Sequence, residues 1–256
     1  MRIIFCNVTY LRYYDGRIVG ELKPKTGGRW VQEHEDAHEK WNFLNMDGMC
    51  YGYVQANCEQ MHIEKLDKVY KQQDAANDIT VVWCASDEKK GTVVVGWYEH
   101  ANAYRYVQDA VVTPISGIER CYWFSTKAEN AYLLPEKDRT FVVVRAAKTG
   151  AGTGFGQSNC WYAESKYAKE NVIPEVMDFI EKNREKRINL LNDKFDKPEN
   201  NIVPITNGGT NASDGATGLK NLFADGITVL SSYQYGDELP EAGTAGRIFF
   251  KRIVEE

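Results

Sequence analysis

Several features that mark whole classes of protein are missing from this 256-residue sequence. Its six cysteines are scattered and form no C-x-x-C pair, which argues against a cysteine zinc site. No apolar run approaches the roughly 20 residues of a membrane-spanning helix. The start "MRIIFCNVTYLRYY" has no long apolar segment that would predict a signal peptide. We therefore expect a cytoplasmic protein with reduced, buried thiols and no membrane partner.

Positive charge is also scarce, since the formal net charge is −5. This argues against a generic basic coat for nucleic acid, because affinity for phosphates comes from lysine and arginine. It leaves room for a pocket that holds a single base. The fractions of hydrophobic residues (43%) and charged residues (26%) are those of an ordinary globular protein.

Phosphate-binding and hydrolase motifs are absent as well. Glycines alternate at positions 150, 152, 154 and 156 in "KTGAGTGFGQSN", which does not match G-x-G-x-x-G, and no G-x-x-x-x-G-K-[ST] occurs. Ser158 is not set in G-x-S-x-G. We predict a non-enzymatic protein without catalytic residues or a cofactor, and a glycine-rich loop that lets backbone approach a ligand.

One metal-binding pattern is present. His34-Glu35-Asp36-Ala37-His38 matches H-E-x-x-H, in which two histidines on one helical face hold zinc and the glutamate is the general base. A zinc peptidase also needs a third ligand downstream. The neighbouring Gly27-Gly28 and a strand-like segment soon afterwards do not favour a long helix here, so a zinc metallopeptidase is kept as a remote alternative.

The clearest structural pattern is a hairpin. Two nearly continuous apolar runs, 79–85 and 92–98, flank the polar turn "SDEKKG", which predicts a central strand pair buried on both faces. The spacing of apolar residues in "IPEVMDFIEKNREKRINLL" predicts a helix over 174–192, and "IEKLDKVYKQQ" a short one. A polar linker over 193–202 then precedes a tail rich in glycine, threonine and alanine.

Aromatic residues are numerous. Most of them are expected in the core, but two or three could stack on an unpaired base. The candidates that fall outside simple core alternation are Trp30, Trp41, Phe43, Trp97, Tyr98, Tyr104, Trp161 and Tyr162. Ser158 and Asn159 come just before Trp161 and place hydrogen-bonding groups beside a ring face, as recognition of a base edge requires.

Residues 1–182 carry a family resemblance. The blocks "GGRWVQEHEDAHEKWNF", "CYGYVQ", "ITVVWCAS", "GTVVVGWYEHANAYR", "LLPEKDR" and "GFGQSNCWYA" resemble, in the same order, a bacterial N-terminal module usually fused to nucleases or McrB-type motor proteins. That module is similar to the EVE-like branch of the PUA-like superfamily. The resemblance implies an α+β domain, a small twisted β-barrel with flanking helices.

The resemblance also implies a function. Relatives bind nucleic acid that carries a modified base, often by flipping the base into an aromatic cage; here the implied base is 5-methylcytosine, 5-hydroxymethylcytosine or N6-methyladenine. By motif match the pocket candidates are Trp30, His38, Glu39, Asn42, Phe43, Trp97, Tyr98, Tyr104, Gln157, Ser158, Asn159 and Trp161. Arg105, Arg145 and Lys148, with Arg120 and Arg139, are candidates for a basic groove that contacts the backbone.

Three positions depart from the usual blocks. Trp30 stands where tyrosine is usual, Ala37 where glycine precedes His-Glu, and His100 where asparagine is usual. In this register the family block aligns through His38 and Glu39. The H-E-x-x-H match is then accidental, and no metal is expected.

The tail has a resemblance of its own. Residues 203–256, which contain "PITNGGTNASDGATGLKNLFADG", resemble segments of phage tail-fibre and other virion proteins. This predicts a separate short β-rich segment that assembles a homo-oligomer or contacts a virion partner. The alternative function is therefore a phage or prophage structural or attachment protein that binds a non-nucleic ligand, in the host cytoplasm or the virion.

Overall fold

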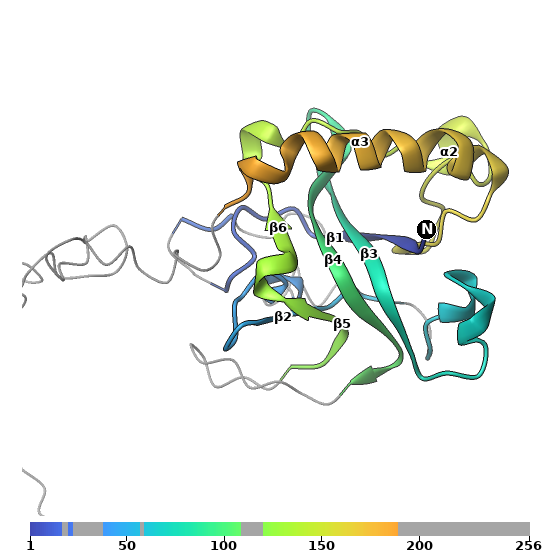
Figure 1. Cartoon of the computed structure of the whole chain (residues 1–256). Coiled ribbons are helices and arrows are strands. Elements are labelled where there is room, and N and C mark those ends of the chain that lie inside the picture. The colour runs from blue at the N-terminus through green and yellow to red at the C-terminus, as the bar shows by residue number, and fades with distance from the viewer. Residues whose placement is uncertain (17–19, 23–37, 57–58, 109–119, 189–256) are drawn as a thin grey trace, which may run out of the picture. The chain divides into compact units, whose positions relative to one another are not determined.

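The computed structural model describes residues 1–16, 20–22, 38–56, 59–108 and 120–188 (Figure 1). They belong to one compact unit, Met1–Asp193. Several predictions fall outside the described residues: the candidate Trp30, the histidine-glutamate pair His34 and Glu35, the linker 193–202, and the phage-type segment 203–256.

The described unit is mixed α/β and is built on one large sheet. Its strand order is β2-β5-β4-β3-β1-β7, and β6 also pairs with β4. The strands are β1 (Ile3–Val8), β2 (Met49–Gly52), β3 (Ala75–Asp87), β4 (Gly91–Gln108), β5 (Tyr122–Lys127), β6 (Ala131–Leu133) and β7 (Cys160–Trp161). Neighbouring strands are antiparallel except β1 and β3, which run parallel.

The central hairpin β3–β4 confirms the predicted pair of strands buried on both faces. Side chains alternate between the faces of a strand, and both apolar runs are almost wholly buried. The Asp87 carboxylate accepts hydrogen bonds from the backbone N–H groups of Lys89 and Lys90, both at 2.8 Å, and Gly91 takes a φ of +90°. These contacts form the turn that the polar segment predicts.

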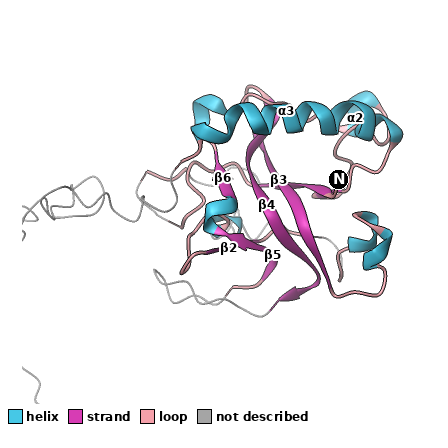
Figure 2. Cartoon of the chain, viewed as in Figure 1, coloured by secondary structure: helices cyan, strands magenta, loops and turns pink. Residues whose placement is uncertain are grey.

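The two faces of the sheet bury two different cores. One lies inside the curve of the sheet and includes Ile4, Cys6, Phe43, Trp83, Tyr98 and Phe124. The other lies between the opposite face and helix α3 (Ile173–Asn183) and includes Phe5, Val82, Trp97, Phe155, Val176 and Ile180. Figure 2 shows α3 crossing over β6, β4 and β3.

The long helix begins and ends earlier in the chain than predicted. It begins with a wide π-helical turn, Ala168–Val172, continues as α3, and ends with the 3-10 turn Arg184–Lys186, 19 residues in all. The prediction of helix up to residue 192 is wrong because the backbone is extended at Arg187, and Ile188 N–H then donates to Leu133 C=O at 2.7 Å. Pairing with β6 thus replaces the next helical turn.

The other helical segments are short. They are α2 (Ala146–Thr149) and the 3-10 turns η1 (His38–Trp41), η2 (Ile63–Lys65), η3 (Lys68–Tyr70), η4 (Ala128–Asn130) and η5 (Glu136–Asp138). The short helix expected in "IEKLDKVYKQQ" is therefore two 3-10 turns. The Asp67 carboxylate caps the second turn by accepting from Val69 N–H at 3.1 Å, which interrupts the helix.

The described strands do not form a closed barrel. Strands β2 and β7 are the two ends of the hydrogen-bonded order, so the expected closure by strand pairing is not found in these residues. The chain after β2 nevertheless spans the gap. Gln55 C=O accepts from the Asn159 side chain at 3.0 Å, and Tyr162 hydroxyl accepts from His62 N–H at 2.9 Å. The chain that follows β2 therefore reaches the β7 edge of the sheet, although β2 and β7 do not pair with each other.

Candidate functional site

A small hollow lies where β2 and β5 meet the turn before β2. Its lining residues are Trp41, Leu44, Met46, Tyr51, Arg120, Cys121 and Tyr122. It encloses about 260 Å³ of space, part of it open solvent.

A tight turn forms one wall of this aromatic pocket. Met46 and Met49 exchange both backbone hydrogen bonds, at 2.8 and 3.0 Å, around Asp47 and Gly48. Both central residues have positive φ, +50° and +88°, as a two-residue hairpin turn requires and as an Asp-Gly pair readily adopts. The Asn45 side chain accepts from Gly48 N–H at 2.9 Å and holds the turn closed.

Strand pairing brings the aromatic rings together. Tyr51 lies on β2 and Tyr122 on β5, and their ring centroids are 4.8 Å apart. Tyr104 on β4 lies edge-on to Tyr122, with centroids 5.7 Å apart, and its hydroxyl hydrogen-bonds with that of Ser125 at 3.0 Å. Three half-buried tyrosines from three neighbouring strands thus form one stripe that begins in the pocket.

Arg120 supplies the positive charge of the pocket. Its guanidinium carbon lies 5.1 Å from the ring centroid of Trp41, within the range of a cation–π contact. The pKa of the Tyr53 phenol is raised to about 12, mainly by desolvation and then by Cys121 and Glu39, while Arg120 partly offsets them. The pocket residues Arg120 and Cys121 therefore act electrostatically on the same phenol.

The block Asn42-Phe43 has a structural role. The Asn42 side chain donates to Tyr53 C=O and accepts from Tyr53 N–H, both at 2.9 Å, and so ties the end of β2 to the preceding turn. Phe43 packs edge-on against Tyr98, whose hydroxyl donates to Asn42 C=O. These three predicted pocket residues are almost fully buried and have no surface to offer a ligand.

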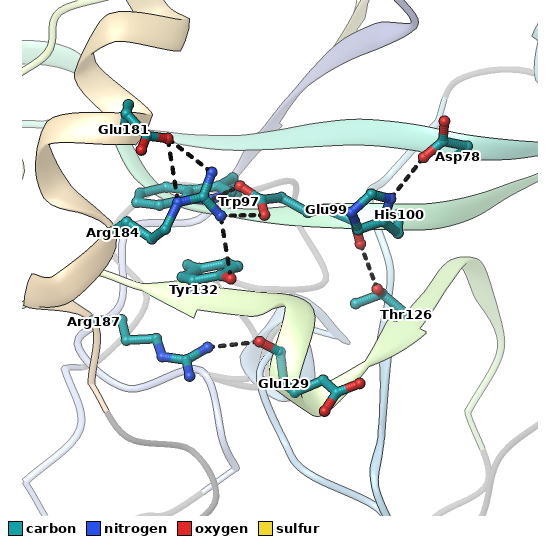
Figure 3. Close-up of polar contacts among 10 residues, drawn as sticks. All are labelled: Asp78, Trp97, Glu99, His100, Thr126, Glu129, Tyr132, Glu181, Arg184 and Arg187. Carbon is teal, nitrogen blue, oxygen red and sulfur yellow. Dashed lines mark hydrogen bonds and ion pairs between the residues drawn. The ribbon is translucent and has the colours of Figure 1, made fainter.

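Trp97 is also sealed in the core, beneath the end of α3. Its ring stacks on Tyr132 with centroids 5.2 Å apart and planes 9° from parallel, and its indole N–H donates to Glu99 at 3.2 Å. Arg184 clamps this stack by donating to Glu99 and Tyr132, and Arg187 lies 4.7 Å over the Tyr132 ring (Figure 3). The predicted pocket role of Trp97 does not fit this burial.

The second predicted block lies along the β7 edge of the sheet. Gln157 and Ser158 are exposed, while Asn159 and Trp161 are half-buried. Asn159 bonds to Asn7 and to Gln55, and the Trp161 ring packs on Phe5 with centroids 4.9 Å apart. The family resemblance implied a set of pocket residues from Trp30 to Trp161. None of those that the structure describes lines the aromatic pocket.

The predicted basic groove is not assembled. Arg105 donates to Gln73, Tyr70 and Lys71 carbonyls and to the Glu64 carboxylate, and so supports the 3-10 turns before β3. Arg139 is fully buried and donates to three carbonyl groups.

Arg145 donates to the side chains of Thr92, Asn7 and Ser86. Of the four basic candidates away from the pocket, Lys148 alone is exposed. Arg105 and Arg145 were predicted to contact the nucleic-acid backbone. In the structure their hydrogen bonds instead stabilise the fold.

The histidine pattern is seen only in part. His38 is exposed and its ring lies 5.4 Å from the Tyr53 ring, while Glu39 is buried. His100 pairs with Asp78 at 2.7 Å on the surface (Figure 3). Within the described ranges, no three His, Cys, Asp or Glu side chains come together in a group that could hold a metal ion.

Sequence reasoning missed most of the pocket. Trp41 was among the stacking candidates, and Arg120 was named for the groove. Tyr51 and Tyr122 were not singled out, although each stands in a short strand pattern, "CYGYVQ" and "RCYWF". The pair Asp47-Gly48, a short way after Trp41, could have indicated the pocket from sequence. An Asp-Gly pair predicts the tip of a hairpin, and this hairpin forms one wall of the pocket.

Among the described residues, no helix is long and apolar enough to cross a membrane. No known family model, curated protein or solved structure matches this chain.

Proposed function

We propose that residues 1–182 form a non-enzymatic binding module of the PUA-like, EVE-like type, which recognises a modified base in nucleic acid, and that the aromatic pocket holds this base. The observation that carries the proposal is the convergence of Trp41, Tyr51 and Tyr122 around a small surface hollow with Arg120 in its wall. Rings bind the face of a base, and a guanidinium donates hydrogen bonds to acceptors on its edge.

The path of the chain after β2 supports the same proposal. It reaches the β7 edge through the Asn159–Gln55 and His62–Tyr162 hydrogen bonds, on the side of the sheet's larger apolar core. In this arrangement the pocket lies at the β2–β5 end, and its rings are fixed by strand pairing before a ligand arrives. Preorganised rings reduce the entropy lost on binding.

The acidic net charge limits the kind of binding. Arg105, Arg139 and Arg145, three of the residues predicted to line a basic groove, are instead engaged within the protein. We therefore expect weak, weakly salt-dependent contact with the backbone and a larger share of the affinity from the pocket. The attachment role predicted for residues 203–256 stays a prediction.

The test is a titration of fluorescent oligonucleotides, single- and double-stranded, that carry one 5-methylcytosine, 5-hydroxymethylcytosine or N6-methyladenine, against unmodified strands. We expect one modification to bind more tightly. Tyr122→Leu should weaken that binding about 10- to 100-fold, since stacking on one aromatic ring contributes about 1–3 kcal/mol.

Tyr167→Leu is the matched control. Tyr167 is half-exposed and lies outside the pocket, so its replacement should leave affinity unchanged. Thermal unfolding of each variant checks that the fold is kept. Equal affinity for all strands, modified and unmodified, would refute the proposed function.

A further inference from the structure

Two cysteines that lie far apart in the sequence face each other at the edge of the sheet. Cys6 on β1 is the direct cross-strand neighbour of Cys160 on β7. The next pair is Asn7 and Asn159, in which Asn7 N–H donates to Asn159 C=O at 2.7 Å. Hydrogen-bonded and non-hydrogen-bonded pairs alternate along antiparallel strands, so the cysteine pair occupies a non-hydrogen-bonded position.

That position suits a disulfide. Opposite residues at such a site have Cα atoms about 4.5 Å apart and side chains on the same face, and disulfides form at Cα separations of about 4.4–6.8 Å. Cys6 belongs to the enclosed core, and Cys160 packs against the same core. The strand register therefore places the two cysteines within the Cα range of a disulfide.

The other described cysteines are placed differently. Cys84 lies on β3 next to β1, but its side chain belongs to the core on the opposite face of the sheet, beneath α3. Cys50 and Cys121 lie on or beside β2 and β5, at the other end of the strand order. Among the cysteines that the structure describes, Cys160 alone is set opposite Cys6 by the strand register.

The two thiols differ in exposure. Cys160 is half-exposed and Cys6 is fully buried. Burial, followed by the adjacent Cys160 thiol, raises the pKa of Cys6 well above its ordinary value. Cys160 is thus the thiol that an oxidant in solution reaches, and Cys6 is the buried partner that completes the bond.

We propose that Cys6 and Cys160 are an oxidation site, a cross-strand thiol pair that hydrogen peroxide converts into a reversible disulfide. The Cys160 thiolate attacks one peroxide oxygen, the O–O bond breaks, and hydroxide leaves a sulfenic acid on Cys160. The Cys6 thiolate then attacks that sulfur, the S–S bond forms, and the S–O bond breaks to release a second hydroxide. The two thiol protons convert both hydroxides to water; the cysteines are oxidised and the peroxide is reduced.

The bond would staple β7 to β1. Strand β7 has only two residues and carries Trp161, with Asn159 and its contact to Gln55 just before it. Oxidation would thus fix β7, next to the Asn159–Gln55 contact, to its neighbour β1, and reduction would release that covalent tie. The second step should be faster at higher pH, because the raised pKa of Cys6 leaves little thiolate at neutral pH.

The test treats the reduced full chain with equimolar hydrogen peroxide under native conditions, then maps peptides without reduction. We expect a peptide that links Cys6 to Cys160, a loss of two free thiols, and a melting temperature raised by roughly 5–10 °C, reversed by dithiothreitol. Cys160→Ser should abolish the link and the shift, and the matched control Cys84→Ser should retain both.

Other results would overturn the proposal. One is a sulfenic acid trapped on Cys160 without any disulfide. Another is a Cys6 link to a different cysteine that persists in Cys160→Ser. If Cys6→Ala fails to fold, Cys160→Ser still decides the matter, because serine is close in size to cysteine and Cys160 is only partly buried.

Discussion

Replacement of Arg105 by glutamine should destabilise the domain without acting on any ligand. The Arg105 guanidinium donates to the Glu64 carboxylate at 2.8 Å and to the carbonyl oxygens of Tyr70, Gln73 and Lys71. Its side chain is 10% exposed, and that of Glu64 is 30% exposed. Loss of the charge leaves these acceptors unpaired in a poorly solvated site, at a cost of about 3 kcal/mol.

The same pair predicts a pH dependence. Desolvation raises the pKa of Glu64, but hydrogen bonds from Arg105, from its own backbone and from His62, together with the Arg105 charge, outweigh this and lower it from 4.5 to about 2. A lowered pKa in the folded state contributes stability that is present above pH 4.5 and is lost as the pH falls to 2. Partial exposure of Glu64 limits the contribution to about 1–2 kcal/mol.

Urea unfolding followed by tryptophan fluorescence at pH 7, 5 and 3 measures both effects. Wild type should lose stability between pH 5 and 3, while Arg105→Gln and Glu64→Gln should lose less over that window. The control is Arg2→Gln, which breaks a more exposed pair with Asp67 and should have a much smaller effect at pH 7. The reasoning fails if Arg105→Gln is as stable as wild type, or if Glu64→Gln keeps the full pH dependence.

Asn42→Ala tests how the β2 edge is held, and a pair of glycine variants tests the packing of β4. Asn42→Ala removes both hydrogen bonds to the Tyr53 backbone, so we expect a loss of about 2 kcal/mol in urea unfolding and a looser β2 edge by hydrogen exchange; unchanged exchange at Tyr53 N–H would contradict this role. Gly96→Ala places a methyl group 2.4 Å from Tyr132 C=O and should cost about 3 kcal/mol, whereas Gly91→Ala meets no atom within 4 Å, and its positive φ alone should cost about 1 kcal/mol. Equal losses for the two glycine variants would refute this packing argument.

Local pattern was enough to predict the centre of the sheet. The apolar runs 79–85 and 92–98 are nearly continuous because both faces of β3 and β4 are covered, by the enclosed core on one side and by α3 on the other. The amphipathic spacing of Val176 and Ile180 likewise predicted a helix that buries one face. Such patterns depend on near neighbours in the sequence, so they can be recognised without the tertiary structure.

The ends of elements were predicted less well, because long-range contacts decide them. Nothing between residues 184 and 191 breaks the helical spacing, yet Ile188 pairs with Leu133, 55 positions earlier in the chain, and the helix stops. A backbone hydrogen bond to a strand edge outweighs a weak local preference for helix. Helix propensity alone cannot show that such an edge is free.

The candidate site shows the same division. Residue type indicated aromatic stacking, and short local strand patterns contain the rings of Tyr51 and Tyr122. Their accessibility depends on tertiary contacts: Trp97, Tyr98 and Phe43 are buried between layers, while Tyr51 and Tyr122 remain half-buried beside the hollow where β2 pairs with β5. Burial depends on what packs against each face, and for these strands the packing partners lie tens of residues away in the chain.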